Sequence, residues 1–204
     1  MCIRDSLNSL GLVAIYQEDY AAATRYFEEA LAIARALGNR EAVGKFLTNL
    51  GLVAERQGDY PLAIRRYEES LAILREIGAR HAALLNVLNL GDVATAQGDD
   101  EAAGRYYLEV LPEALALGAL HVALGTVRGL AGVQARAGNH AQAARLIGLV
   151  LSHPASSAEE RSSAEPILTF LQDRLPAAAL EAALAQGKAL LLETVAEELV
   201  TLRH

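Results

Sequence analysis

Two asparagines, Asn49 and Asn89, have the side-chain chemistry and the spacing of a binding site. They stand 40 residues apart, and a carboxamide offers both a hydrogen-bond donor and an acceptor, which matches the polar groups of a peptide bond. At the same place on neighbouring packed helices they would lie about 10 Å apart, the length of roughly three residues of extended chain. The pair could therefore hold the backbone of a stretched peptide. The alternative is that the two amides bridge adjacent helical pairs.

Residues suited to catalysis do not form a recognisable set. Gly187-Lys188 has Ala182 where a phosphate-binding loop requires its first glycine, and Ala189 where it requires Ser or Thr. The sequence contains no Gly-x-Ser-x-Gly elbow and no His-Glu-x-x-His helix, and no histidine has a His or Cys partner at metal-ligand spacing. The single cysteine, Cys2, excludes an internal disulfide. We therefore expect no enzymatic activity, no metal and no cofactor.

A column of arginines also recurs at the 40-residue interval. Its members are Arg25, Arg65, Arg105 and Arg145, and three of them precede a glutamate by four residues, at Glu29, Glu69 and Glu109. The column could bind phosphates or nucleic acid, but the spacing favours i,i+4 ion pairs on a solvated helix face. The net charge is −7 and the basic residues are dispersed, so we expect no direct contact with nucleic acid.

These residues belong to a repeat with a period of 40 residues. Four apolar or small-residue columns recur without exception: Leu10, Leu50, Leu90 and Leu130; Val13, Val53, Val93 and Val133; Ala23, Ala63, Ala103 and Ala143; and Leu31, Leu71, Leu111 and Leu151. A fixed period of roughly 20 to 50 residues is typical of a solenoid, in which each unit buries its apolar face against its neighbours.

Each repeat is predicted to be a helical hairpin. In the second repeat, apolar residues from Leu47 onward recur at steps of three and four and mark a first helix. Gly58 can end that helix, and Asp59 can cap the next one. Gly51 on the first helix and Ala63 on the second leave little side chain between the backbones. We therefore expect the two helices to cross closely at this pair.

The pattern resembles the tetratricopeptide repeat over about three quarters of the chain. The second repeat matches it at Leu47, Leu50, Gly51, Ala54, Gly58, Tyr60, Ala63, Tyr67 and Ser70, whereas the later repeats depart from it at Asp100, Ala131, His140 and Ile147. The long period, and the lack of a proline closing the second helix, are similar to the long-repeat subclass of kinesin light chains and bacterial regulators. The resemblance implies an all-α fold, a right-handed α-α superhelix whose first helices line a concave groove.

The family's ligand-facing positions transfer only onto the first helices. These groove candidates are Lys45, Thr48, Asn49, Leu52, Glu55, Arg56, Leu85, Leu88, Asn89, Asp92, Arg128 and Arg136. Asn49 and Asn89 resemble the asparagines with which long-repeat relatives hold the main chain of a peptide.

The predicted boundaries follow the period. Residues 1–6 (MCIRDS) precede it, and we expect a non-native or disordered leader there, with a genuine first helical turn capped by Asp5 or Ser6 as the alternative. If the leader is non-native, the chain is a C-terminal fragment. Four hairpins are expected at residues 7–46, 47–86, 87–126 and 127–151, followed by a loop at 152–157 and capping helices at 158–204.

Three features organise the predicted tail. Ser157 and Glu160 form a capping box at the start of a helix, Pro166 should kink or divide that helix, and Gly187 should end a later short helix. The residues 184–190 and 193–196, LAQGKAL and ETVA, are similar to the C-terminal sensor region of bacterial repeat-containing ATPases and transcriptional activators.

Composition limits the remaining possibilities. The 204 residues are 52% hydrophobic, and four hairpins leave no room for a separate catalytic domain. No apolar run reaches the length of a membrane span, and no signal sequence precedes the repeats, so we expect a cytoplasmic protein with no membrane contact.

The resemblance implies a protein-interaction and sensor scaffold. Its groove would take a peptide, a partner domain or a small inducer, as the C-terminal part of a larger bacterial signalling or transcriptional regulator. The alternative is a passive assembly scaffold that self-associates through the uncapped N-terminal hairpin.

Overall fold

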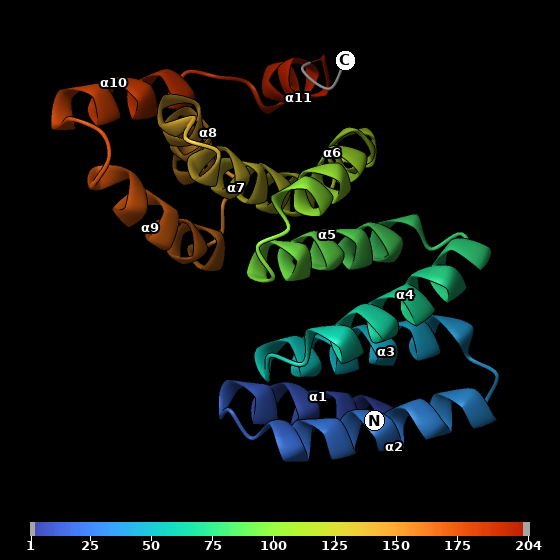
Figure 1. Cartoon of the computed structure of the whole chain (residues 1–204). Helices are drawn as coiled ribbons and strands as arrows, with labels where there is room; N and C mark the ends of the chain where they lie inside the picture. Colours follow the sequence, from blue (N-terminus) through green and yellow to red (C-terminus); the bar gives the residue numbers. More distant parts are fainter. Residues whose placement is uncertain (1–2, 202–204) are drawn as a thin grey trace. The chain divides into compact units, whose positions relative to one another are not determined.

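The computed structural model describes residues 3–201, and in this part of the chain the regular structure is entirely α-helical (Figure 1). The helices are α1 (Ile3–Tyr16), α2 (Tyr20–Ala36), α3 (Arg40–Arg56), α4 (Tyr60–Glu76), α5 (Arg80–Ala96), α6 (Asp100–Ala116), α7 (Leu120–Arg136), α8 (His140–Ser152), α9 (Ala158–Gln172), α10 (Ala177–Lys188) and α11 (Leu192–Thr201). The predicted all-α fold class is confirmed. A superhelix running along the whole chain stays a prediction.

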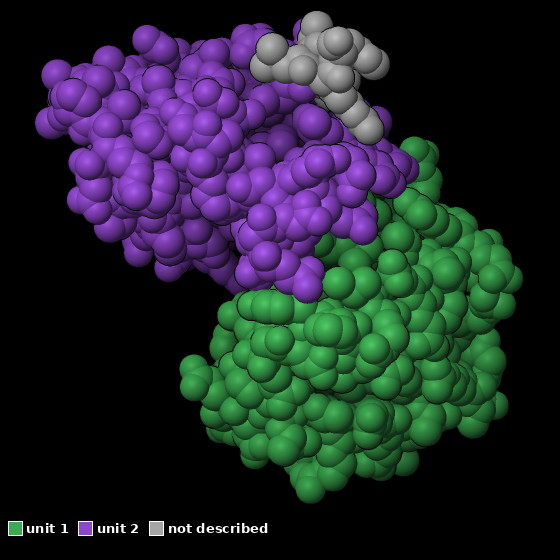
Figure 2. All heavy atoms as spheres, in the orientation of Figure 1, with its two compact units in different colours: residues 1–93 green, residues 94–204 purple. Residues whose placement is uncertain are grey.

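Two compact units divide the chain within α5 (Figure 2). Unit 1 is Met1–Val93 and unit 2 is Ala94–His204. In unit 1, α1 packs on α2, α2 on α3, and α3 on α4. In unit 2, α6 packs on α7 and α7 on α8. Consecutive helices therefore pack side by side within each unit, as the hairpin pattern predicts.

The predicted turn chemistry is confirmed where the first hairpin helix gives way to the second. Gly58 has a φ of +76°, a conformation that costs glycine little because it has no Cβ. The Asp59 side chain then accepts a hydrogen bond from the backbone N–H of Leu62 at 3.0 Å and caps α4. The equivalent turn of the first hairpin has Glu18 in place of the glycine, with a φ of +58°.

The helices begin earlier than the repeat boundaries counted from the apolar columns. The second repeat was counted from Leu47, but α3 begins at Arg40, because the Asn39 side chain caps it by accepting from the Ala42 N–H at 3.0 Å. Likewise α1 begins at Ile3, so residues 3–6 are helical and are not a disordered leader. They are in register with residues 43–46, which lie well inside α3. Met1 and Cys2 lie outside the described residues.

The close crossing of α3 and α4 is real, but the predicted partner of Gly51 is wrong. A Cβ added to Gly51 would lie 2.5 Å from a ring carbon of Tyr67, one turn after Ala63. The glycine therefore accommodates an aromatic ring that is fully buried between the helices. Spacing alone identified the correct face of α4 but not the residue on it that reaches Gly51.

The tail helices pack on the last hairpin. The capping box at Ser157 is confirmed, since its hydroxyl accepts from the Glu160 N–H at 3.1 Å and the Glu160 carboxylate accepts from the Ser157 N–H at 2.7 Å. Helix α9 runs through Pro166 without interruption and packs on α7 and α8.

Gly187 does not end its helix, contrary to prediction. Helix α10 continues to Lys188, and a Cβ at Gly187 would collide with the backbone carbonyl of Arg145 in α8. Gly148 of α8 meets the Leu184 carbonyl of α10 in the same way. The two glycines let the backbones of α8 and α10 touch.

Candidate functional site

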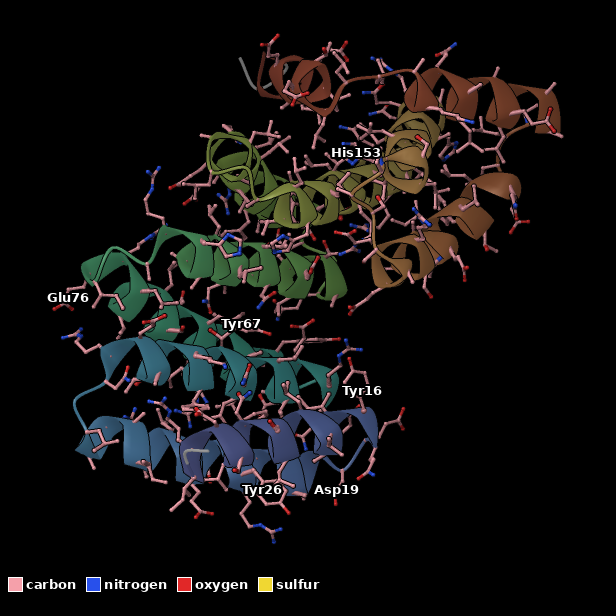
Figure 3. The ribbon with its side chains drawn as sticks, turned by 180° about the vertical axis from the view of Figure 1, so that it is seen from behind. Tyr16, Asp19, Tyr26, Tyr67, Glu76 and His153 are labelled. Carbon is pink, nitrogen blue, oxygen red and sulfur yellow. The ribbon has the colours of Figure 1, made fainter. Side chains whose placement is uncertain are left out.

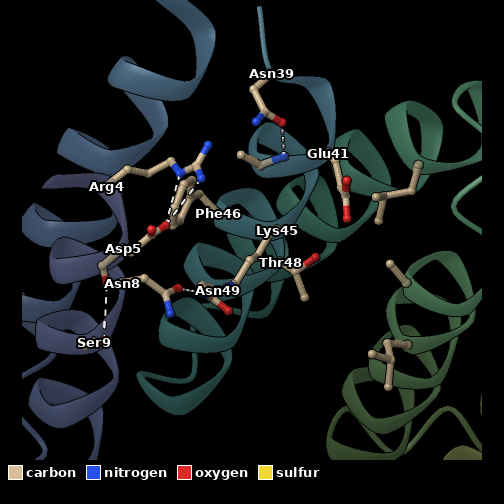
Figure 4. A pocket seen from close by; sticks show the side chains of 14 residues that line it. Arg4, Asp5, Asn8, Ser9, Asn39, Glu41, Lys45, Phe46, Thr48 and Asn49 are labelled. Carbon is tan, nitrogen blue, oxygen red and sulfur yellow. Dashed lines mark hydrogen bonds and ion pairs between the residues drawn. The ribbon is translucent and has the colours of Figure 1, made fainter. Parts of the chain in front are cut away.

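A groove of about 600 Å³ opens in unit 1 (Figure 4). Its wall comes mainly from α1, α3 and α5, the first helices of their hairpins. Its volume is within the roughly 300–1,000 Å³ typical of ligand sites. The lining residues are Arg4, Asp5, Asn8, Ser9, Asn39, Glu41, Ala42, Lys45, Phe46, Thr48, Asn49, Leu74, Ala82 and Leu85.

The groove brings together four of the predicted site residues. These are Lys45, Thr48, Asn49 and Leu85. Six more candidates in unit 1 lie outside its lining: Leu52, Glu55, Arg56, Leu88, Asn89 and Asp92. Of these, Leu88 is buried in the core and Arg56 is exposed. Arg128 and Arg136 belong to unit 2.

Lys45 is the groove residue best placed to meet a ligand. Its side chain is exposed, and it forms no ion pair or hydrogen bond with any residue in the described range 3–201. Glu41, one helical turn earlier on α3, is also exposed and equally without a partner in that range. An ammonium and a carboxylate are thus both available on one side of the groove (Figure 4).

Asn49 joins two neighbouring hairpins. Its side-chain N–H donates to the Asn8 carbonyl oxygen of α1 at 3.1 Å. This bond is the bridging role that the sequence left open as an alternative. It uses one of the amide's polar groups, so within residues 3–201 the Asn49 oxygen and second N–H keep their hydrogen-bonding capacity. Asn89, its repeat equivalent, is half-buried and outside the groove.

Thr48 belongs to a polar network between helices. Its hydroxyl lies 2.9 Å from that of Ser70 on α4 and 3.1 Å from the Asn86 carbonyl oxygen on α5. The Ser70 hydroxyl donates to the Gly44 carbonyl oxygen at 2.8 Å. Ser70 and Asn86 are fully buried, so this network satisfies polar groups that would otherwise be costly to bury. Thr48 thus stabilises the groove wall.

Glu55 binds the core tyrosine. The Tyr67 hydroxyl donates to its carboxylate at 2.7 Å, and Tyr67 lies among the helices of unit 1 (Figure 3). Burial, reinforced by the negative charge of Glu55, raises the pKa of Tyr67 well above its ordinary value near 10. In unit 2 the Tyr107 hydroxyl lies 3.0 Å from that of Thr95, at the same repeat positions. Each buried phenol thus has a partner twelve residues earlier.

The arginines serve structural contacts, and the predicted i,i+4 pairing is wrong for the best-defined cases. Arg136 pairs with Asp100 at 2.6 Å, and Arg145 of α8 pairs with Glu198 of α11 at 2.7 Å. Glu69 pairs with Arg35 of the previous hairpin at 2.8 Å instead of Arg65. Contacts between helices orient these long side chains, because an exposed pair along one helix gains only a few tenths of a kcal/mol.

Sequence reasoning missed the α1 side of the groove. Arg4, Asp5 and Asn8 were not considered, because the leader was set aside and the family positions were transferred only from the second repeat onward. The repeat itself held the signal, since Asn8 stands 40 residues before Thr48.

The groove's chemistry is suited to binding. Its ionisable residues are Arg4, Asp5, Glu41 and Lys45, and Arg4 and Asp5 already pair at 3.3 Å. Among residues 3–201, no group of three His, Cys, Asp or Glu side chains could hold a metal ion. In the same range, no helix is long and apolar enough to cross a membrane.

The helices α1 to α4, with glycines under core aromatic rings and capped turns, are the part of the chain that comparison with protein families identifies. Residues 3–76 match the tetratricopeptide repeat family. Tetratricopeptide repeats are protein-interaction scaffolds, and the groove described above lies largely within these two hairpins. No curated protein matches the sequence.

Proposed function

We propose that the groove of unit 1 binds an extended segment of a partner protein. The observation that carries this proposal is the groove itself, with Lys45 and Glu41 unengaged at its side and an amide pair, Asn8 and Asn49, in its wall. Three neighbouring first helices at about 10 Å spacing extend over about 20 Å, which six residues of extended chain would cover. The amides can hold the ligand backbone, and the two charges select its side chains.

The chain has a built-in control for this proposal, because it contains only two lysines, Lys45 and Lys188. Both are exposed, and Lys188 lies at the end of α10 in unit 2. Peptides can be selected on the protein from a random display library and measured by isothermal titration. We expect Lys45→Ala to weaken their binding by about tenfold through loss of a charged contact, and Lys188→Ala to leave it unchanged. Equal affinities for both variants would contradict the groove as the binding site.

We propose further that the occupied groove acts as a sensor within a larger signalling or transcriptional regulator. The support for this role is the short similarity of residues 184–196 to the sensor regions of bacterial regulators. Sequencing the source gene upstream of Met1 tests it. A nucleotide-binding or DNA-binding domain in the same reading frame is the expected result, and a stop codon directly upstream would contradict it.

A further inference from the structure

The first hairpin exposes an apolar face that its neighbour keeps buried. The exposed fractions of the side chains are 70% for Ile3, 47% for Leu10 and 51% for Val13. Forty residues later, the equivalent fractions are 8% for Val43, 5% for Leu50 and 1% for Val53. The same columns of the repeat are therefore closed on α3 and open on α1.

The helix that closes these columns on α3 is known. Helix α2 packs against α3, and its Leu31 and Ala34 share one core cluster with Val43, Leu50 and Val53. The exposure of Ile3, Leu10 and Val13 shows that no described residue plays this part for α1. The open face thus continues an established interface of the fold, one repeat earlier.

The open face is suited to meet a copy of itself. From Ser6 to Gln17 the sequence contains no Asp, Glu, Lys, Arg or His. Two such faces can therefore approach without placing like charges together and without burying an unpaired charge. A contact of a face with its own copy is the geometry of a two-fold dimer.

Head-to-tail stacking is the other way to cover the face with a second copy, and the tail opposes it. Such stacking requires a free second helix at the end of the array. In unit 2 the last second helix, α8, is already packed by α9 and α10. The α1 face remains as the surface through which two copies can associate.

We infer that the chain forms a two-fold homodimer through Ile3, Leu10 and Val13 of α1. A helix of 14 residues is about 21 Å long, so the buried area is small and the dimer exchanges rapidly with monomer. Each copy carries a net charge of −7, so the copies repel each other and added salt strengthens the association.

Sedimentation velocity over a series of protein concentrations, at low and high salt, tests this inference. The expected result is a reversible monomer–dimer equilibrium that shifts toward dimer as salt rises. The double variant Leu10→Glu/Val13→Glu should raise the dissociation constant by at least about tenfold, because it places charges in an apolar contact. The single variant Ile3→Glu, at a more exposed position, should act in the same direction even if the double variant folds poorly.

Leu191→Glu is the matched control. Leu191 is 68% exposed and lies in unit 2, so this variant should dimerise like the parent chain. A parent chain that stays monomeric at all concentrations would overturn the inference and leave the face to another protein. A dimer that survives both α1 changes, or that Leu191→Glu also disrupts, would overturn it too.

Discussion

At the scale of single residues, the buried phenol of Tyr67 predicts a specific dependence of stability on pH. Its hydroxyl binds Glu55 at 2.7 Å, and burial raises its pKa above the value of about 10 expected in the unfolded chain. Above pH 10 the unfolded state loses a proton that the folded state keeps. The stability that Tyr67 contributes is therefore present below pH 10 and declines above it, by up to about 1.4 kcal/mol per pH unit.

Tyr67→Phe should therefore cost about 1 kcal/mol near pH 7, the contribution of a hydrogen bond, and progressively less above pH 10. Urea unfolding of both proteins from pH 7 to pH 11 measures the difference. Tyr26→Phe, at a half-buried position on α2, provides the control and should show neither effect. A Tyr67→Phe deficit that stays constant across this range would contradict the assigned role of the phenol.

Two glycines inside helices should respond to alanine with opposite signs. A Cβ at Gly51 meets the Tyr67 ring at 2.5 Å, so Gly51→Ala should cost about 1–3 kcal/mol by overpacking. A Cβ at Gly104 of α6 meets nothing within 4 Å, so Gly104→Ala should add up to about 1 kcal/mol through helix propensity. Urea titration of the two variants decides the matter, and changes of the same sign would refute this account of the crossing.

At the scale of elements, the turn between α1 and α2 has a strained residue. Glu18 occupies the position of Gly58 with a φ of +58°, which costs a residue with a Cβ about 1–2 kcal/mol. Glycine would remove this strain, although its greater freedom in the unfolded chain offsets part of the gain. We expect Glu18→Gly to stabilise the protein by about 0.5 kcal/mol in thermal or urea unfolding.

The converse change provides the control for this turn. Gly98 has a φ of +77°, so Gly98→Ala should destabilise by about 1 kcal/mol. A loss of stability in Glu18→Gly would show that the glutamate side chain contributes more than its backbone strain costs.

The contact between α8 and α10 depends on its two glycines. Alanine at Gly187 would meet the Arg145 carbonyl, a backbone atom that cannot rotate away, so we expect a loss at or above the upper end of about 1–3 kcal/mol. Amide exchange in α10 should also become faster as the helix detaches. Gly132→Ala, whose Cβ would meet only ordinary contacts beyond 3.4 Å, should leave α10 protected. Unchanged exchange in Gly187→Ala would contradict the close contact.

The elements were largely predictable because each repeat states the same pattern again. Glycines at the turns and the acidic caps after them gave the helix ends near Gly58, which the structure confirms. The helix starts were missed because the Asn39 cap lies seven residues before the first apolar column. The role of Gly187 was missed because a glycine that ends a helix and one that permits close packing look alike until the opposing backbone is known.

The site was less predictable because a polar residue on a first helix can face a ligand or its own core. Thr48 and Glu55 were both assigned to the groove, but Ser70, Asn86 and Tyr67 engage them. A sequence signal for this existed. Tyr67 and Tyr107 have a polar residue twelve positions earlier, whereas Phe27, which has no hydroxyl, has Ile15 there.

At the scale of the whole molecule, the chain presents two surfaces with different chemistry. The groove offers charges and amides along the first helices of unit 1, which suits a peptide segment. The outer face of α1 is apolar and uncharged, which suits a second copy. The two surfaces use different residues of α1, so the Leu10→Glu/Val13→Glu variant should keep its peptide affinity. Isothermal titration of this variant checks their independence, and a lost affinity would show that the surfaces are coupled.

The most direct test of the groove uses the two lysines as reporters. Reductive methylation with ¹³C-formaldehyde labels Lys45 and Lys188 along with the terminal amine, and the Lys45→Arg variant assigns the Lys45 signal in an NMR spectrum. On titration with a selected peptide, the account predicts that the Lys45 signal shifts to saturation while the Lys188 signal stays in place. A peptide that binds without moving the Lys45 signal, or that moves only the Lys188 signal, would contradict the groove as the binding site.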